Sequence, residues 1–297
     1  MIEILNKNII NVAGGPGGDA TLIVGREGAA LIDCGMAYCA DRLVENVETI
    51  LGEKPLSFVI LSHTHYDHIG GIMALRRKWP DLLVLSSEHG KKVLDKQSSK
   101  DTIHELSILA SKLFKHDMEE LDMKGLFVDE AIKDGDIIDL GNVQIESILT
   151  KGHTKCSMSF FLRNESLLFA SETCGVFSKY GEMSAVFLTS YKDTVNSINK
   201  LRRLDAKYVV SPHYGLIEKE DSKRYWDWGL EAAETCKKFV VKYYKDGYSK
   251  EEILARFVKQ FRSEASFELQ PYEAFELNAS LSIGVIIREF FKEGQLI

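Results

Sequence analysis

The stretch HTHYDH, residues 63–68, brings three histidines and one aspartate together within six residues. It directly follows an apolar run, residues 58–61, that predicts a buried strand. Imidazole and carboxylate groups on a turn at the end of a strand suit Zn²⁺ or Fe²⁺ far better than Ca²⁺ or Mg²⁺. A surface loop rich in histidine by chance is the weaker alternative, because the whole chain contains only eight histidines. The stretch therefore predicts a metal site, with the first two histidines on one ion and the aspartate and third histidine carried towards a second.

Further motifs follow predicted strands along the rest of the chain. They are DCG at residues 33–35, KGHT at 151–154, SET at 171–173 and SPHYG at 211–215, with a predicted strand pair over 137–149 before the second of them. In this order, and together with residues 63–68, they resemble the motifs of the metallo-β-lactamase-fold hydrolases over roughly residues 1 to 217. The resemblance implies an α+β fold, a four-layer αβ/βα sandwich that holds its metals at one edge between two sheets.

The same resemblance implies two divalent metal ions, with Zn²⁺ as the first choice and Fe²⁺ or Mn²⁺ as alternatives. The ligands that it implies are His63, His65, Asp67, His68, His153, Glu172 and His213. The chain departs from the family pattern at two points. Glu172, preceded by Ser171, stands where the family has a bridging aspartate after a glycine, and Pro212 replaces the glycine before the last histidine. The longer carboxylate either bridges two ions or binds one and leaves the second site empty.

The chemistry implied by this ligand set is hydrolysis. Two cations that share a water lower its pKa, so that a metal-bound hydroxide exists at pH 7 and attacks a polarised carbonyl or phosphoryl group. Asp67 is expected to take the proton or to orient the hydroxide. Tyr66 and Tyr214 flank ligands and are expected either to donate a hydrogen bond to an oxyanion or to pack. Side chains expected to fix the orientation of the ligand rings are Asp33, Thr154 and Ser157.

Periodicity divides the chain into a catalytic domain over residues 1–220 and a helical C-terminal cap over 221–297. The first contains a predicted helical insert at about 88–121, where apolar residues recur at helical spacing. In the second, Ser249-Lys250-Glu251-Glu252 is a capping-box signature. The many aromatic residues of the cap are expected mainly to pack against the sandwich, while a few of them and the insert line a substrate tunnel.

Composition excludes some classes of partner. The net charge of −7 and a pI near 5.7, without a cluster of basic and aromatic residues, argue against a nucleic-acid surface. No apolar run is long enough to cross a membrane, and the N-terminus lacks the features of a signal peptide. Five scattered cysteines without a C-x-x-C pair indicate a reduced, cytoplasmic protein. A small-molecule substrate is expected, and a homodimer is left open.

The favoured function is a metal-dependent hydrolase of a small ester, thioester or lactone. A thioester is preferred because the helical insert and helical C-terminus resemble the layout of coenzyme A thioesterases in the family. A redox enzyme on the same scaffold, a mononuclear iron dioxygenase or a di-iron protein, is the first alternative. His65 and His68 argue against the flavodiiron type, whose similar motif has acids among its ligands. A binding or regulatory module with a structural metal is the second alternative, and an exposed apolar face on residues 221–297 would favour it.

Overall fold

The computed structural model describes residues 3–116, 118, 120–263, 270–292 and 295–296. The chain divides into two compact units. The first comprises residues 1–149 and 158–166, and the second comprises residues 150–157 and 167–297. The predicted division into a catalytic domain and a cap at residue 220 stays a prediction.

Seven strands in sequence order form the main sheet of the first unit. They are β1 (Glu3–Asn6), β2 (Ile9–Asn11), β3 (Thr21–Val24), β4 (Ala29–Ile32), β5 (Phe58–Ile60), β6 (Leu83–Ser87) and β7 (Glu130–Ile132). Neighbours are antiparallel from β1 to β4 and parallel from β4 to β7. The central strands are apolar throughout, as strands covered on both faces must be, and Leu31 and Val59 are fully buried. Because β4 and β5 run parallel, the residues that follow them, Asp33 and Ser62, meet at one edge of the sheet.

The helices of the first unit are η1 (Ala37–Cys39), α1 (Ala40–Leu51), α2 (Tyr66–Ile69), α3 (Ile72–Lys78), α4 (Glu88–Leu94) and α5 (Gln97–Leu113). The insert predicted to stay helical to about residue 121 is wrong over its last part, because α5 ends at Leu113 and Lys115 has a left-handed φ of 60°. The predicted strand pair is confirmed by β8 (Ile137–Asp139) and β9 (Gln144–Leu149), which pair antiparallel, and β10 (Met158–Leu162) continues from β9.

Parallel strands also position the polar residues of the second unit. Strand β11 (Leu167–Phe169) lies parallel to β14 (Tyr208–Ser211), and β15 (Gly215–Leu216) turns back on β14. The short helix η2 (Glu172–Cys174) follows β11, so Glu172 and His213 emerge from the same ends of two neighbouring strands. Between them the chain forms the hairpin β12 (Val176–Phe177) and β13 (Met183–Ser184) and the helix α6 (Tyr191–Arg202).

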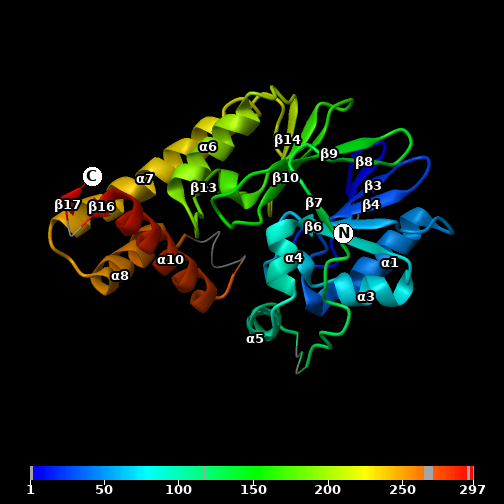
Figure 1. The fold of residues 1–297 in the computed structure, drawn as a ribbon, viewed down its shortest axis with the longest axis horizontal. Helices are drawn as coiled ribbons and strands as arrows, with labels where there is room; N and C mark the ends of the chain where they lie inside the picture. The colour runs from blue at the N-terminus through cyan, green and yellow to red at the C-terminus, as the bar shows by residue number, and fades with distance from the viewer. Residues whose placement is uncertain (1–2, 117, 119, 264–269, 293–294, 297) are drawn as a thin grey trace. The chain divides into compact units, whose positions relative to one another are not determined.

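The C-terminal part of the second unit is helical, as predicted. It contains α7 (Tyr225–Lys245), α8 (Lys250–Phe261) and α10 (Tyr272–Phe290), followed by β16 (Phe291–Lys292) and β17 (Gln295–Leu296). Figure 1 shows α8 and α10 side by side next to the end of α7, and all three pairs of helices are in contact. The capping box at Ser249 is confirmed, since its hydroxyl accepts from the amide of Glu252 and the Glu252 carboxylate accepts from the amide of Ser249.

An apolar core of the second unit lies among these helices, with Val240, Ile253 and Ile283 among its buried residues. The predicted helix stop at Gly294 lies outside the described residues, and α10 ends at Phe290. Among the described residues, no helix combines the length and the apolar character needed to span a membrane.

Candidate metal centre

The first set of candidate ligands lies just after β5 in the first unit. The chain is still extended at His65, with φ −75° and ψ 152°, and α2 begins at Tyr66. Asp67 and His68 therefore stand on one helical turn, rather than on the simple turn expected from the sequence. The ring of His63 lies 4.5 Å from that of His65 and 4.1 Å from that of His68, measured between centroids. The structure thus brings together all three histidines of the motif.

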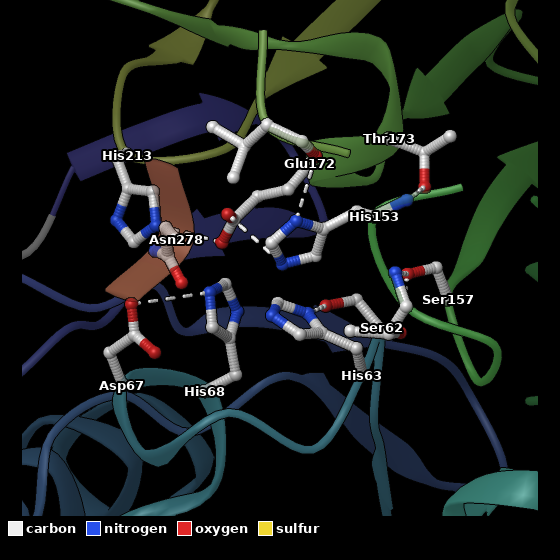
Figure 2. Close-up of polar contacts among 12 residues, drawn as sticks. Ser62, His63, Asp67, His68, His153, Ser157, Glu172, Thr173, His213 and Asn278 are labelled. Carbon is white, nitrogen blue, oxygen red and sulfur yellow. Dashed lines mark hydrogen bonds and ion pairs between the residues drawn. The ribbon is translucent and has the colours of Figure 1, made fainter. Parts of the chain in front are cut away.

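Asp33 and Ser62 hold two of these rings in place. The Nδ1 atom of His68 lies 2.8 Å from Oδ2 of Asp33. Asp33 also accepts hydrogen bonds from the amide of Ser62, at 2.7 Å, and from its hydroxyl, at 2.6 Å. The Ser62 hydroxyl lies 3.1 Å from Nδ1 of His63 (Figure 2). Burial raises the pKa of Asp33, and the neighbouring His68 opposes that shift. The expected orienting role of Asp33 is confirmed, whereas Ser62 was missed although it directly precedes the motif.

With Nδ1 of His68 held by Asp33, the other nitrogen of that ring faces Asp67. The distance from Nε2 of His68 to Oδ2 of Asp67 is 3.7 Å (Figure 2). A histidine whose second nitrogen is bound to a carboxylate is the usual arrangement for a metal ligand. The loop at residues 14–18 links β2 to β3. It passes so close to α2 that a Cβ atom on Gly18 would lie 2.4 Å from the carbonyl oxygen of Asp67.

The second set of candidate ligands lies in the second unit and centres on Glu172. Its Oε1 atom is 3.1 Å from Nε2 of His213, and its Oε2 atom is 3.4 Å from Nε2 of His153 (Figure 2). The carboxylate is buried, with 8% of the residue exposed. Each oxygen of one carboxylate thus faces a different imidazole, which is the disposition that a bridging ligand needs. His213 adopts a left-handed φ of 59°, a strained backbone typical of functional positions.

A backbone carbonyl and a side-chain hydroxyl hold His153. Its Nδ1 atom lies 2.9 Å from the carbonyl oxygen of Val186, and its amide donates to the hydroxyl of Thr173. Thr154 and Ser157, expected to fix the ring, instead close the turn after it, with their hydroxyls 2.7 Å apart. The prediction that Thr154 and Ser157 orient the His153 ring is therefore wrong, and the carbonyl oxygen of Val186 contacts the ring instead. A main-chain carbonyl has no residue signature, so no sequence pattern could have indicated this contact.

The strand end before His213 has a further support. The hydroxyl of Tyr225, at the start of α7, donates to the hydroxyl of Ser211 at 3.1 Å. Tyr225 is fully buried, and that burial raises the pKa of its phenol. The sequence shows that this helix is rich in aromatic residues, but not which of its rings contacts the strand.

The chemistry of both donor sets fits divalent transition metals. In the first unit, the ligand atoms of His63 and His65 lie within 4.8 Å of each other, and so do those of Asp67 and His68. In the second unit the same holds for Glu172 and His213. Imidazole nitrogens with a few carboxylates suit Zn²⁺, Fe²⁺ or Mn²⁺, and the rings of His68 and His153 have their second nitrogens bound as metal ligands do.

The two candidate tyrosines have different environments. Tyr66 is 8% exposed and begins α2, directly after His65. Tyr214 is 40% exposed, and its ring packs edge-on against Phe177 with 5.0 Å between centroids. Each tyrosine therefore flanks a candidate ligand, but only the side chain of Tyr214 is exposed.

The remaining histidines and cysteines do not form a further candidate site among the described residues. His89 and His116 are exposed, and His104 is half-buried. All five cysteines are reduced, and Cys156 and Cys174 are buried. Burial raises the pKa of Cys174 to about 12, so its thiol stays protonated at neutral pH. Among the described residues, every member of a group of three or more potential ligands belongs to one of the two donor sets.

A family model, that of the metallo-beta-lactamase superfamily, matches residues 13–213. Among curated proteins, the chain is 23% identical over 283 residues to a flavo-diiron protein of Clostridium acetobutylicum, which covers 84% of this chain and 64% of the relative. It is 26% identical over 152 residues to a hydroxyacylglutathione hydrolase of Buchnera aphidicola, a match that covers 51% of this chain and 45% of the relative. It is 24% identical over 231 residues to an atrochrysone carboxyl ACP thioesterase of Aspergillus fumigatus, a match that covers 75% of this chain and 61% of the relative.

The chain thus spans less than two thirds of the length of each of these relatives. Among solved structures, a metallo-beta-lactamase family protein from Thermus thermophilus superimposes with a TM-score of 0.66 at 16% identity. The match covers 96% of this chain and 95% of that one. At this identity the likeness concerns the fold, and it confirms the expected α+β sandwich with a C-terminal helical region.

Proposed function

Because this chain belongs to the metallo-beta-lactamase superfamily, we propose that it is a metal-dependent hydrolase that cleaves a small ester, thioester or lactone, with a thioester preferred. The position of Glu172 carries the proposal, since its two carboxylate oxygens face two different imidazoles. This geometry supports the interpretation that the longer side chain replaces a bridging aspartate. Similarity to a hydroxyacylglutathione hydrolase and to an ACP thioesterase supports hydrolysis of a thioester.

The proposed metal ligands are the seven residues expected from the sequence. They are His63, His65, Asp67 and His68 in the first unit and His153, Glu172 and His213 in the second, as ligands of divalent ions. When bound, divalent ions in such a site lower the pKa of water towards neutrality and polarise the carbonyl oxygen that is attacked. Zinc is proposed first, with iron or manganese as the alternatives.

The chain's own residues have distinct roles in this proposal. Asp67 accepts the proton of the attacking water or orients that water, and its position beside His68 supports this role. Asp33 and Ser62 keep the rings of His68 and His63 in fixed orientations, so little reorganisation is needed during the reaction. Tyr214, the more exposed of the two tyrosines, donates a hydrogen bond to the developing oxyanion, whereas buried Tyr66 packs.

A redox enzyme is the second candidate function, and one observation favours it. The flavo-diiron relative matches 84% of this chain, more than either hydrolase relative does. Oxygen reduction would require iron and consumption of oxygen, whereas hydrolysis requires neither. Because iron is also an alternative metal for the hydrolase, oxygen uptake measured with an oxygen electrode separates the two functions.

The test of the proposal is the metal content of protein purified without chelator or added metal. We expect about two zinc ions per chain, together with hydrolysis of thioesters in a substrate screen. His63→Ala should lower both the metal content and the activity, while His89→Ala, at an exposed histidine, should change neither. About one iron per chain with oxygen uptake would favour the redox enzyme instead. Full activity in His63→Ala would rule out the proposed site.

The cellular setting is also a proposal. Five free thiols and an acidic chain support a reduced, cytoplasmic environment and a small-molecule substrate rather than nucleic acid or a membrane. A binding module remains an alternative, because Tyr272, Leu277 and Leu281 on α10 are each more than a third exposed. A homodimer would be one way to cover them.

A further inference from the structure

A cavity of about 230 Å³ lies among the C-terminal helices of the second unit. Its walls come from α7, α8, α10 and residues 183–186, which include β13. Three aromatic rings supply much of the apolar surface: Phe257, Phe261 and Phe275. None of the described residues that line the cavity carries a charge. The cavity thus suits an uncharged and largely apolar group.

One wall of the cavity is joined to a candidate metal ligand. Val186 lines the cavity, and its carbonyl oxygen lies 2.9 Å from Nδ1 of His153. The other nitrogen of His153 lies 3.4 Å from the carboxylate of Glu172. The hydrogen bond from the cavity wall therefore reaches the ring whose opposite nitrogen faces the carboxylate. The cavity therefore adjoins the side of His153 that carries Nδ1.

The size and polarity of the cavity narrow the class of ligand. Sites for whole small molecules usually measure about 300 to 1,000 Å³, so this cavity fits one part of a molecule. The polar groups of the lining are neutral, and they include Ser282 and Asn278, whose amide donates to Gln270 at 3.4 Å. Burial raises the pKa of the Cys236 thiol to about 12, which keeps that lining group uncharged. The charged carboxylates of a glutathione carrier have no cationic partner among these residues.

We propose that this cavity binds the alkyl or aryl part of the substrate's acyl group and thereby sets the preferred chain length. The inference rests on the proposed hydrolase function, because it assigns one end of the substrate of that reaction. The leaving group remains outside the cavity.

Binding without turnover provides the first test. Straight-chain carboxylates from butanoate to decanoate, which correspond to the acid released by hydrolysis, are titrated calorimetrically into the protein as purified. Each methylene buried in the cavity should tighten binding by about threefold to fourfold until the cavity is full. Affinity that does not depend on chain length would overturn the inference.

Variants that change the cavity volume provide the second test. Ala232→Phe, on the α7 wall, should weaken octanoate binding by more than tenfold and remove the dependence on chain length. Ala255→Phe adds the same bulk at an exposed position of α8 that is outside the lining, and it should bind as the unaltered protein does. Phe275→Leu enlarges the cavity and should shift the optimum to longer chains, a change that misfolding cannot produce. Wild-type chain-length profiles in both cavity variants would contradict the assignment.

Hydrolysis of p-nitrophenyl esters of the same acids separates this inference from the proposed function. Chain-dependent binding that Ala232→Phe abolishes, without hydrolysis of any ester, would support the cavity and refute the hydrolase. Hydrolysis at one rate for every chain length, unaffected by Ala232→Phe, would support the hydrolase and refute the cavity.

Discussion

At the scale of single residues, Glu172 is the position at which the chain departs most from its family pattern. The carboxylate is one methylene longer than an aspartate, yet its two oxygens still lie 3.1 and 3.4 Å from the imidazoles of His213 and His153. Glu172 begins a short helix, η2, directly after β11. From this position the longer side chain reaches both imidazoles.

Substitutions at Glu172 give a prediction at this scale. Glu172→Ala leaves two imidazole nitrogens without their carboxylate, so metal content should fall from about two ions per chain to about one. Glu172→Asp keeps the charge and should retain more metal than the alanine variant. Elemental analysis of both variants checks this, with Glu231→Ala at an exposed position of α7 as the control. Equal metal loss in the aspartate and alanine variants would show that the length of the side chain is essential.

Most of the candidate ligands could be predicted from residue types, whereas their supports could not. The composition of residues 63–68 alone indicates candidate metal ligands. Asp33 could be expected from its place after a predicted strand. Ser62 and Tyr225 are ordinary residues in the sequence, and only the pairing of distant segments makes them partners of Asp33 and Ser211. Val186 contributes a backbone oxygen, which any residue could supply.

At the scale of elements, local signals predicted the start of α8 but not the end of α5. Ser249 and Glu252 encode the start of α8 within four residues, and both capping hydrogen bonds form. The end of α5 is different, because no glycine or proline stands near Leu113 and the helical periodicity continues beyond it. The helix stops where Lys115 turns left-handed, which periodicity does not report. The register and partners of strands such as β11 and β14 depend on contacts between distant segments.

The capping box of α8 gives a prediction at this scale. Ser249→Ala removes the hydroxyl that accepts from the amide of Glu252, so the free energy of unfolding should fall by about 1 kcal/mol. Ser98→Ala, at an exposed serine of α5, is the matched control and should cause little change. Urea unfolding of the three proteins checks the difference. A loss of the same size in both variants would contradict a specific role of the cap.

At the scale of the whole molecule, similarity of fold and similarity of function are separate findings. The solved structure from Thermus thermophilus covers nearly the whole chain at 16% identity, and this likeness concerns the fold. The curated relatives include both hydrolases and a flavo-diiron protein, so a shared scaffold serves more than one chemistry. The choice between them therefore depends on the reaction that is measured and on the metal that is found, and not on the fold.

Removal of metal gives a prediction for the whole chain. Ions that bind the folded chain and not the unfolded chain add about 4 kcal/mol at a thousandfold excess over their dissociation constant. Dialysis against a chelator should therefore lower the melting temperature, and added Zn²⁺ should restore it. His63→Ala should respond less to the chelator than the unaltered protein does. Identical melting curves with and without chelator would exclude stabilising metal ions.

The pairing of β11 with β14 has a consequence for how this protein can change. Glu172 and His213 sit at the ends of these paired strands, 41 positions apart, and the chain between them leaves the sheet and returns to it. That excursion contains β13 and the adjoining cavity wall at Val186. We expect substitutions in that excursion to alter the cavity while Glu172 and His213 stay at the ends of the paired strands.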